Sequence, residues 1–278
     1  MITGKSQLAG VIGWPVGHSR SPRVHNHWLA RHKIDGAYVP LAVAPERLKE
    51  AIRGLPALGF LGANVTIPHK EAVIPHLDAV DSAAARIGAV NTIVVQDGQL
   101  HGSNTDGFGF LENLHAGAPD WRSDAGPTVV VGAGGAAKAV AWALIDAGVP
   151  SLRLVNRTRA RAEVLAEAIG PTASVVDWDA RADALHEAAL VVNTTTLGMS
   201  GQSTLDLDLT HLPTAAVVSD IIYQPVETPL LLAARARGHV AVEGVGMLLH
   251  QARPAFRKWF GVDPRVDAEL LQHVLAGN

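Results

Sequence analysis

Short apolar runs alternate with segments that repeat their apolar positions at helical spacing. In the first third of the chain, the segments expected as strands are 10–13, 37–43, 63–66 and 90–95. Those expected as helices are 21–33, 45–55 and 69–77. Asp97-Gly98 separates 90–95 from the short strand 99–101, which is a strong signal for a β-hairpin. The pattern predicts an α/β sheet that is mostly parallel and contains one hairpin.

A second series of the same kind starts after a loop at 116–126 that is rich in Gly, Pro, Asp and Ser. Its expected strands are 128–131, 151–155, 188–193, 215–219 and 240–242, and its expected helices are 135–147, 158–169 and 229–237. Two final helices, 247–260 and 264–275, have no strand after them, and we expect them to pack on the first domain. The predicted domains are therefore 1–106 with 245–278, and 107–244.

Composition narrows the function classes. A chain of 278 residues fits about two domains, and 48% apolar residues support an ordinary core. The net charge of −3 gives no reason to expect nucleic acid or an anionic membrane as a partner. The absence of cysteine excludes disulfides, thiolate metal sites and a cysteine nucleophile. No apolar run is long enough to span a bilayer, and residues 1–7 lack a secretory apolar region, so we expect a cytoplasmic protein.

A glycine-rich turn opens the second series. Gly132-Ala133-Gly134-Gly135-Ala136-Ala137 follows an apolar strand and begins a helix. Glycines at the first and third positions permit a tight turn and a close approach of pyrophosphate to the backbone, and a small residue at 137 permits close packing of helix and strand. The N–H groups of the helix start favour phosphate. A purely structural tight turn is the alternative reading.

The end of the next strand indicates which dinucleotide is bound. A site that prefers NAD usually has an acidic residue here, but this chain has Asn156-Arg157-Thr158, with Arg161 one turn later. Guanidinium groups match phosphate oxygens, so the segment favours the 2′-phosphate of NADP. Alternatively, Thr158 is an ordinary N-cap beside surface arginines.

Polar residues of the first domain suggest a small-molecule site. Ser19 and Ser21 stand at the start of the first expected helix and would make a small anion site, although Ser21 is also well placed as an N-cap. Lys70 and Asp106 form a candidate acid/base pair for hydride transfer, with a solvated surface lysine and a capping aspartate as the alternatives. Asn91 and Thr105 would complete a polar pocket.

At these residues the chain closely resembles the shikimate dehydrogenase family. The matching segments run in family order over almost the whole chain: 17–22, 64–70, 88–92, 104–107, 132–137, 156–158, 220–225 with 228–230, and 244–247 with Gln251. The resemblance implies an N-terminal α/β substrate domain, a Rossmann-type NADP-binding domain and C-terminal helices that return to the first domain.

The resemblance also implies roles for matching positions. Lys70 and Asp106 would be catalytic. The substrate would be bound by Ser19, Ser21, Thr66, Lys70, Asn91, Asp106, Tyr223 and Gln251. NADP would be bound by Gly132, Ala133, Gly134, Gly135, Ala136, Asn156, Arg157, Thr158, Arg161, Ile221 and Gly244. The loop 194–203 matches the family less tightly and receives no role.

The implied activity is the NADPH-dependent, reversible reduction of 3-dehydroshikimate to shikimate, in chorismate and aromatic amino acid biosynthesis. No metal is expected, because a lysine and hydrogen bonds can stabilise the developing alkoxide. The expected partner is a small molecule, and the protein would be a monomer or homodimer. The alternatives are an NAD-dependent quinate/shikimate dehydrogenase and a non-catalytic regulator that senses NADP.

Overall fold

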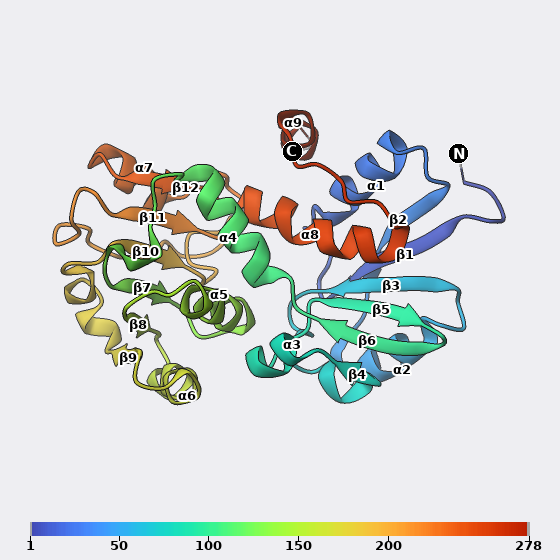
Figure 1. Cartoon of the computed structure of the whole chain (residues 1–278), viewed down its shortest axis with the longest axis horizontal. Helices are drawn as coiled ribbons and strands as arrows, with labels where there is room; N and C mark the ends of the chain where they lie inside the picture. Colours follow the sequence, from blue (N-terminus) through green and yellow to red (C-terminus); the bar gives the residue numbers. More distant parts are fainter. Residues whose placement is uncertain (1, 277–278) are drawn as a thin grey trace. The chain divides into compact units, whose positions relative to one another are not determined.

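The chain forms two compact units in a computed structural model, which describes residues 2–276 (Figure 1). Unit 1 contains residues 2–105 and 251–276, and unit 2 contains residues 106–250. Each unit has a sheet of its own. Among residues 2–276, no helix is long and apolar enough to cross a membrane.

Unit 1 is built on a six-stranded sheet with the strand order β2-β1-β3-β5-β6-β4. Its strands are β1 (Gln7–Gly13), β2 (Gly36–Ala42), β3 (Phe60–Val65), β4 (Ala79–Val80), β5 (Thr92–Gln96) and β6 (Gln99–Ser103). β1 pairs in parallel with β2 and β3, and β4 pairs in parallel with β6. β5 pairs antiparallel with β3 and β6, and Asp97 and Gly98 in the turn have φ values of 52° and 75°. The predicted mostly parallel sheet with one hairpin is confirmed.

Helices cover both faces of this sheet. They are α1 (Ser21–Arg31), α2 (Leu48–Gly54), α3 (Ser82–Ile87), part of α8 (Val245–Phe260) and α9 (Ala268–Leu275), with 3₁₀ turns η1 (Pro45–Arg47) and η2 (Ile74–His76). Ile52 of α2 belongs to an apolar cluster with Ile12, Val65 and Ile93 of the sheet. Aromatic residues fill a second cluster, where the His25 ring stacks on Tyr38 with ring centroids 4.0 Å apart.

The helix α9 and the larger part of α8 belong to unit 1, so the prediction that the C-terminal helices return to the first domain is confirmed. The boundary between the units falls inside α8, before Gln251. α9 packs against α1. Trp28 Nε1 donates to the Arg265 carbonyl at 3.1 Å, and Arg31 forms an ion pair with Asp267 at 2.6 Å. Asp267 also caps α9 by accepting from the Leu270 N–H.

Unit 2 is a doubly wound α/β sheet in which every strand pair is parallel. Its strands are β7 (Thr128–Val131), β8 (Leu152–Val155), β9 (Ala173–Val176), β10 (Leu190–Asn193), β11 (Val217–Asp220) and β12 (Val240–Val242). They lie in the order β12-β11-β10-β7-β8-β9. The strand order reverses between β7 and β10, which is the point at which sheets of this type bind ligands. The predicted Rossmann-type topology is confirmed.

Both faces of this sheet are buried. The helices of unit 2 are α4 (Asp106–Gly117), α5 (Gly135–Asp146), α6 (Arg159–Ile169), α7 (Pro229–Ala236) and the start of α8, with 3₁₀ turns η3 (Ser123–Ala125), η4 (Trp178–Ala180) and η5 (Asp183–Leu185). Val130 packs on one face with α4, α5 and α6. Val129 and Val131 point to the other face, where α7 and the segment 205–212 cover them. This double burial explains the unbroken apolar strands in the sequence.

Several predicted elements need correction. Residues 69–77 are not an α-helix but a series of turns that ends in η2, because Pro68 and Pro75 interrupt a helical ladder. The prediction also missed β4, α3 and β9. α3 carries recognisable end signals, since Asp81 caps it by accepting from the Ala84 N–H at 2.7 Å and Gly88 ends it in the left-handed region. α9 begins at Ala268, later than the expected helix start at 264.

Candidate active site

The serine pair lies at the start of α1 in unit 1. The helix begins at Ser21, and the N-cap position belongs to Arg20, so the prediction that Ser21 is the N-cap is wrong. The Ser21 N–H instead donates to Ser19 Oγ at 3.3 Å. Ser21 is buried and Ser19 is half-buried. The Ser21 hydroxyl therefore does not cap the helix but is hydrogen-bonded to Tyr38, and Ser19 Oγ, which accepts from the Ser21 N–H, still has its own hydrogen to donate to an anion.

A buried polar cluster lies around Asn91 in the same unit. Asn91 Oδ1 accepts from the Thr105 N–H at 2.9 Å, and Asn91 Nδ2 donates to Thr105 Oγ1 at 3.0 Å and to Gln251 Oε1 at 3.3 Å. Thr105 Oγ1 donates to the Gln251 carbonyl at 2.9 Å. These bonds join residues that are far apart in the sequence. The structure thus brings together two predicted site residues, Asn91 and Gln251, and holds their amide groups in fixed orientations.

The segment that contains Thr66 and Lys70 leaves the end of β3. The Thr66 N–H donates to the Ile12 carbonyl at 2.9 Å, and the Lys70 carbonyl accepts from the Val90 N–H at 2.8 Å. Between them His69 is buried, and its Nε2 lies 2.7 Å from the Val43 carbonyl oxygen. Lys70 itself is half-buried. Backbone hydrogen bonds therefore fix this segment at Thr66 and at Lys70, and the lysine side chain is only partly exposed.

Asn64 and Tyr38 were not assigned a role from the sequence, yet both belong to this polar region. Asn64 is buried, donates from Nδ2 to the Asn91 carbonyl at 3.1 Å and accepts from Tyr38 Oη at 2.6 Å. Burial raises the pKa of Tyr38 well above its usual value, against the smaller opposing effect of a hydrogen bond with Ser21. Asn64 lies two residues before Thr66, and in a strand that spacing places two side chains on one face. This spacing is the signal that could have identified it.

Asp106 is the first residue of α4 and belongs to unit 2. It is 4% exposed and directly follows Thr105 in the chain. The capping alternative places Asp106 just before a helix, but α4 starts at Asp106 itself, so this residue lies within the first turn.

The glycine-rich turn of unit 2 has the geometry of a phosphate-binding loop. Gly132 has φ of +121°, and a Cβ at this position would lie 2.4 Å from Thr194 Oγ1, so only glycine fits. α5 begins at Gly135, and the N-cap residue Gly134 supplies no side chain to its free N–H groups. A Cβ added at Gly134 would meet nothing within 4 Å. The approach to the helix start, between Ala133 and Ala136, is therefore open to pyrophosphate.

The arginines at the end of β8 differ in their partners. Arg157 and Arg161 are exposed, and the guanidinium group of neither forms an ion pair or hydrogen bond with any residue from 2 to 276. Arg159 is bound by Glu163 at 2.7 Å and Asp177 at 2.5 Å. Asn156 Nδ2 donates to the Thr158 carbonyl at 2.8 Å, and Thr158 occupies the N-cap position of α6 without a side-chain cap bond. Two unpaired guanidinium groups beside a helix start fit the 2′-phosphate of NADP.

A buried aspartate orders the ends of β10 and β11. Asp220 accepts from Asn193 Nδ2 at 3.1 Å and the Ile222 N–H at 3.0 Å through Oδ1, and from Thr228 Oγ1 at 2.8 Å through Oδ2. Burial raises the pKa of Asp220 to about 6, although these three hydrogen bonds oppose the shift. This network, which sequence analysis left without a function, holds the segment that contains Ile221 and Tyr223.

Gly244 lies against that same segment. A Cβ at Gly244 would be 2.3 Å from the Ile221 carbonyl carbon, so the backbone approaches too closely for any larger residue. Ile221 and Tyr223 are both half-buried. The predicted residues Ile221 and Gly244 are therefore neighbours at the carboxyl end of β11.

The fold and these sites define a dehydrogenase that uses a nicotinamide dinucleotide. Sequence models of the shikimate dehydrogenase family match three stretches: the substrate binding domain at residues 11–93, shikimate/quinate 5-dehydrogenase at 122–200 and the shikimate 5′-dehydrogenase C-terminal domain at 244–268. A curated shikimate dehydrogenase (NADP(+)) from Rhodospirillum rubrum is 61% identical over 99% of both chains. The chain belongs to the shikimate dehydrogenase family.

Solved structures agree with this assignment. A shikimate 5-dehydrogenase from Thermus thermophilus, in complex with NADP(H) and shikimate, superposes with a TM-score of 0.83 at 38% identity and covers 97% of this chain and 98% of its own. A quinate dehydrogenase from Corynebacterium glutamicum, in complex with NAD, gives a TM-score of 0.88 at 35% identity, with coverage of 98% and 99%. The fold is thus shared by enzymes that differ in substrate and cofactor.

Proposed function

We propose that this chain catalyses the reversible, NADP-dependent interconversion of shikimate and 3-dehydroshikimate. The proposal rests on the buried cluster of Asn91, Thr105 and Gln251, because its amide and hydroxyl groups are suited to the hydroxyls of a polyhydroxylated ring. The Rhodospirillum rubrum relative, with coverage of 99% of both chains, supports the same reaction.

The substrate roles follow from the chemistry of each group. Ser19 and Ser21 bind the carboxylate through their hydroxyls at the start of α1, where the helix dipole favours an anion. Thr66, Asn91 and Gln251 bind ring hydroxyls. We also assign Tyr223 to substrate binding, on its position after the buried Asp220 network.

Proton transfer is assigned to Lys70 and Asp106. The ammonium of Lys70 gives a proton to the substrate oxygen during reduction, and the neutral amine takes it back during oxidation. The Asp106 carboxylate accepts a hydrogen bond from the ring hydroxyl. Because the alkoxide is stabilised by these hydrogen bonds, the reaction needs no Lewis acid.

The cofactor is assigned to unit 2. When bound, NADPH supplies the hydride that reduces the ring carbonyl. Gly132, Ala133, Gly134, Gly135 and Ala136 hold its pyrophosphate against the start of α5. The ribose 2′-phosphate is held by Asn156, Arg157, Thr158 and Arg161. Ile221 and Gly244 line the nicotinamide end.

Organisation and setting complete the proposal. We place the functional domains at 1–106 with 245–278 for substrate and at 107–244 for NADP. The protein would act in the cytoplasm, as a monomer or homodimer, in the biosynthesis of chorismate and aromatic amino acids.

A turnover assay with product identification tests the proposal. Purified protein is incubated with shikimate and NADP, NADPH formation is followed by absorbance, and the oxidised product is identified by chromatography. Stoichiometric 3-dehydroshikimate and NADPH are expected. Tight NADP binding without turnover would instead identify the non-catalytic regulator.

A further inference from the structure

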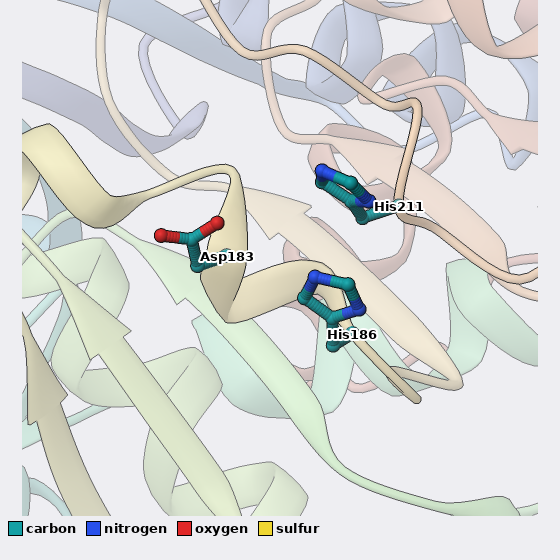
Figure 2. Close-up of side chains that lie close together, drawn as sticks. All are labelled: Asp183, His186 and His211. Atoms are coloured by element: carbon teal, nitrogen blue, oxygen red, sulfur yellow. The ribbon is translucent and has the colours of Figure 1, made fainter.

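A cluster of two histidines and an aspartate lies on the surface of unit 2, away from the residues assigned above. Asp183, His186 and His211 are all exposed, and their nearest donor atoms lie within 4.8 Å of one another (Figure 2). The His186 and His211 rings are 4.3 Å apart between centroids, at an interplanar angle of 26°. Figure 2 shows Asp183 and His186 on one short helical turn and His211 on a separate loop that faces it.

Local backbone geometry brings Asp183 and His186 together. Asp183 opens the 3₁₀ turn η5, and His186 directly follows its last residue. A 3₁₀ helix has three residues per turn, so side chains at i and i+3 project from the same side. Arg153 Nη1 donates to the carbonyls of Ala184 at 2.8 Å and His186 at 2.5 Å, which fixes the end of the turn.

The loop that carries His211 is also fixed. Its leucines Leu205, Leu207, Leu209 and Leu212 are buried in the same apolar cluster as Ala184 and Leu185 of η5. Asp208 Oδ1 accepts from the Thr210 N–H at 2.9 Å and from Thr210 Oγ1 at 2.6 Å, which sets the turn just before His211. The two donor-bearing segments are thus anchored on one core, and the three side chains are held near one another before any ligand arrives.

We propose that Asp183, His186 and His211 bind a single zinc-class divalent cation. Two imidazoles and one carboxylate are a donor set that suits Zn²⁺ and its neighbours Co²⁺ and Ni²⁺, and not Mg²⁺ or Ca²⁺, which prefer oxygen ligands alone. Three protein ligands with water in the remaining position is a common zinc arrangement.

The distances are compatible with coordination after small side-chain rotations. Donors bound to zinc at about 2.0–2.2 Å in a tetrahedron lie roughly 3.4 Å apart. The present separations of up to 4.8 Å require each donor to move by about an ångström. The side chains are exposed, and rotation of the stacked imidazoles about their side-chain torsions supplies this movement without displacing the buried leucines.

The position of the cluster separates this site from the proposed reaction. Asp183 and His186 precede β10 and His211 precedes β11, whereas the nucleotide loop follows the carboxyl end of β7. In a parallel sheet, the segments that precede the strands and the segments that follow them lie at opposite ends of the strands. The cation would therefore cross-link two surface segments and stabilise unit 2, and it would take no part in hydride transfer.

Zinc titration of the metal-free protein tests the proposal. Isothermal calorimetry gives the stoichiometry, thermal melting gives the stabilisation, and Co²⁺ absorption reports a site with nitrogen ligands and low coordination number. We expect one ion per chain, a rise in the melting temperature with Zn²⁺, no rise with Mg²⁺ at the same concentration, and at least a tenfold loss of Zn²⁺ affinity in His211→Ala, His186→Ala and Asp183→Asn. His115→Ala is the matched control, because His115 is an exposed histidine of the same unit outside the cluster.

Each contrary result has a defined meaning. Wild-type affinity in the three cluster variants, or equal loss in His115→Ala, would overturn the proposal. Binding of several weak ions without saturation would also overturn it. The same holds for half an ion per chain together with dimer formation in sedimentation, because that result indicates a site shared between two copies of the chain. Melting of the metal-free variants is measured in parallel, so that a folding defect is recognised and the two remaining variants decide the outcome.

Discussion

At the scale of single residues, substitution of Lys70 tests the proposed proton transfer. Lys70→Ala should lower kcat by roughly two to four orders of magnitude, the range for loss of a positioned acid/base, while KM for shikimate changes much less. Asp106→Asn should also lower kcat. Steady-state kinetics in both directions measure these effects.

Lys49→Ala provides the control for Lys70, because Lys49 is an exposed lysine of the same unit on α2. Its kcat and KM should equal those of the unmodified protein. Near-normal kcat in Lys70→Ala would remove the lysine from the mechanism.

Arg157 tests the choice of cofactor. Arg157→Ala should raise KM for NADP by about ten- to a hundredfold, equivalent to a loss of roughly 1.5–3 kcal/mol for hydrogen bonds to a charged group. KM for NAD should change little, since NAD has no 2′-phosphate. Arg159→Ala is the matched control, because Arg159 is already paired with Glu163 and Asp177. Equal effects of Arg157→Ala on the two cofactors would identify Arg157 as general surface charge.

Ser19 tests the carboxylate site. Ser19→Ala should raise KM for shikimate by about tenfold, from loss of a hydrogen bond to a charged partner worth roughly 1.5 kcal/mol, and leave KM for NADP unchanged. Melting must be measured alongside, because Ser19 Oγ also accepts from the Ser21 N–H. An unchanged KM for shikimate would exclude Ser19 from the site.

Sequence patterns single out candidate site residues but not the partners of those residues in the fold. Lys70, Asn91 and Gly132 stand in short motifs that are visible without a structure. The bonds from Asn91 to Gln251 were not predictable, because they join residues 160 positions apart and depend on the path of α8. The distinction between Arg157 and Arg159 also required three-dimensional contacts.

At the scale of elements, the stability that Asp220 contributes at the ends of β10 and β11 depends on pH. Its pKa is raised by burial from 3.8 to about 6, so its contribution to stability is fully present below the unfolded pKa and is lost as pH rises through the folded value. The loss between about pH 4 and pH 7 approaches 2–3 kcal/mol, from 1.36 kcal/mol per pKa unit.

The substitution Asp220→Asn isolates this effect. Asparagine cannot ionise, so the free energy of unfolding of the variant, relative to the unmodified protein, should rise by about 2–3 kcal/mol between pH 4 and pH 7. Urea unfolding at both pH values measures it. Taking the difference cancels the other carboxylates, such as Asp78, whose pKa is lowered chiefly by a hydrogen bond from Arg53. A difference that does not vary with pH would contradict the assignment of the raised pKa to Asp220.

Most elements were predictable because buried positions are apolar, and the arrangement of apolar residues along the sequence differs between helices and strands. The strands of unit 2 are apolar throughout, since both faces of that sheet are covered. Residues 69–77 misled the prediction, because their helix-like apolar spacing contains Pro75 and follows Pro68. β9 has half-buried and exposed positions at the edge of its sheet, which gives only a weak pattern.

At the scale of the whole molecule, the fold is shared by related dehydrogenases and does not by itself determine which substrate and which cofactor are used. The same architecture is found in a quinate dehydrogenase with NAD and in a shikimate 5-dehydrogenase with NADP(H), at 35% and 38% identity to this chain. We propose that the choice depends on a few side chains, namely the serine pair for the substrate and Arg157 and Arg161 for the cofactor.

The most direct test of the central claim is the specificity constant kcat/KM for shikimate and for quinate, each measured with NADP and with NAD under one set of conditions. Shikimate with NADP should give the highest value of the four, and the preference for NADP should fall sharply in the double variant Arg157→Ala, Arg161→Ala. A higher value for quinate with NAD, or no turnover of shikimate with NADP, would contradict the account.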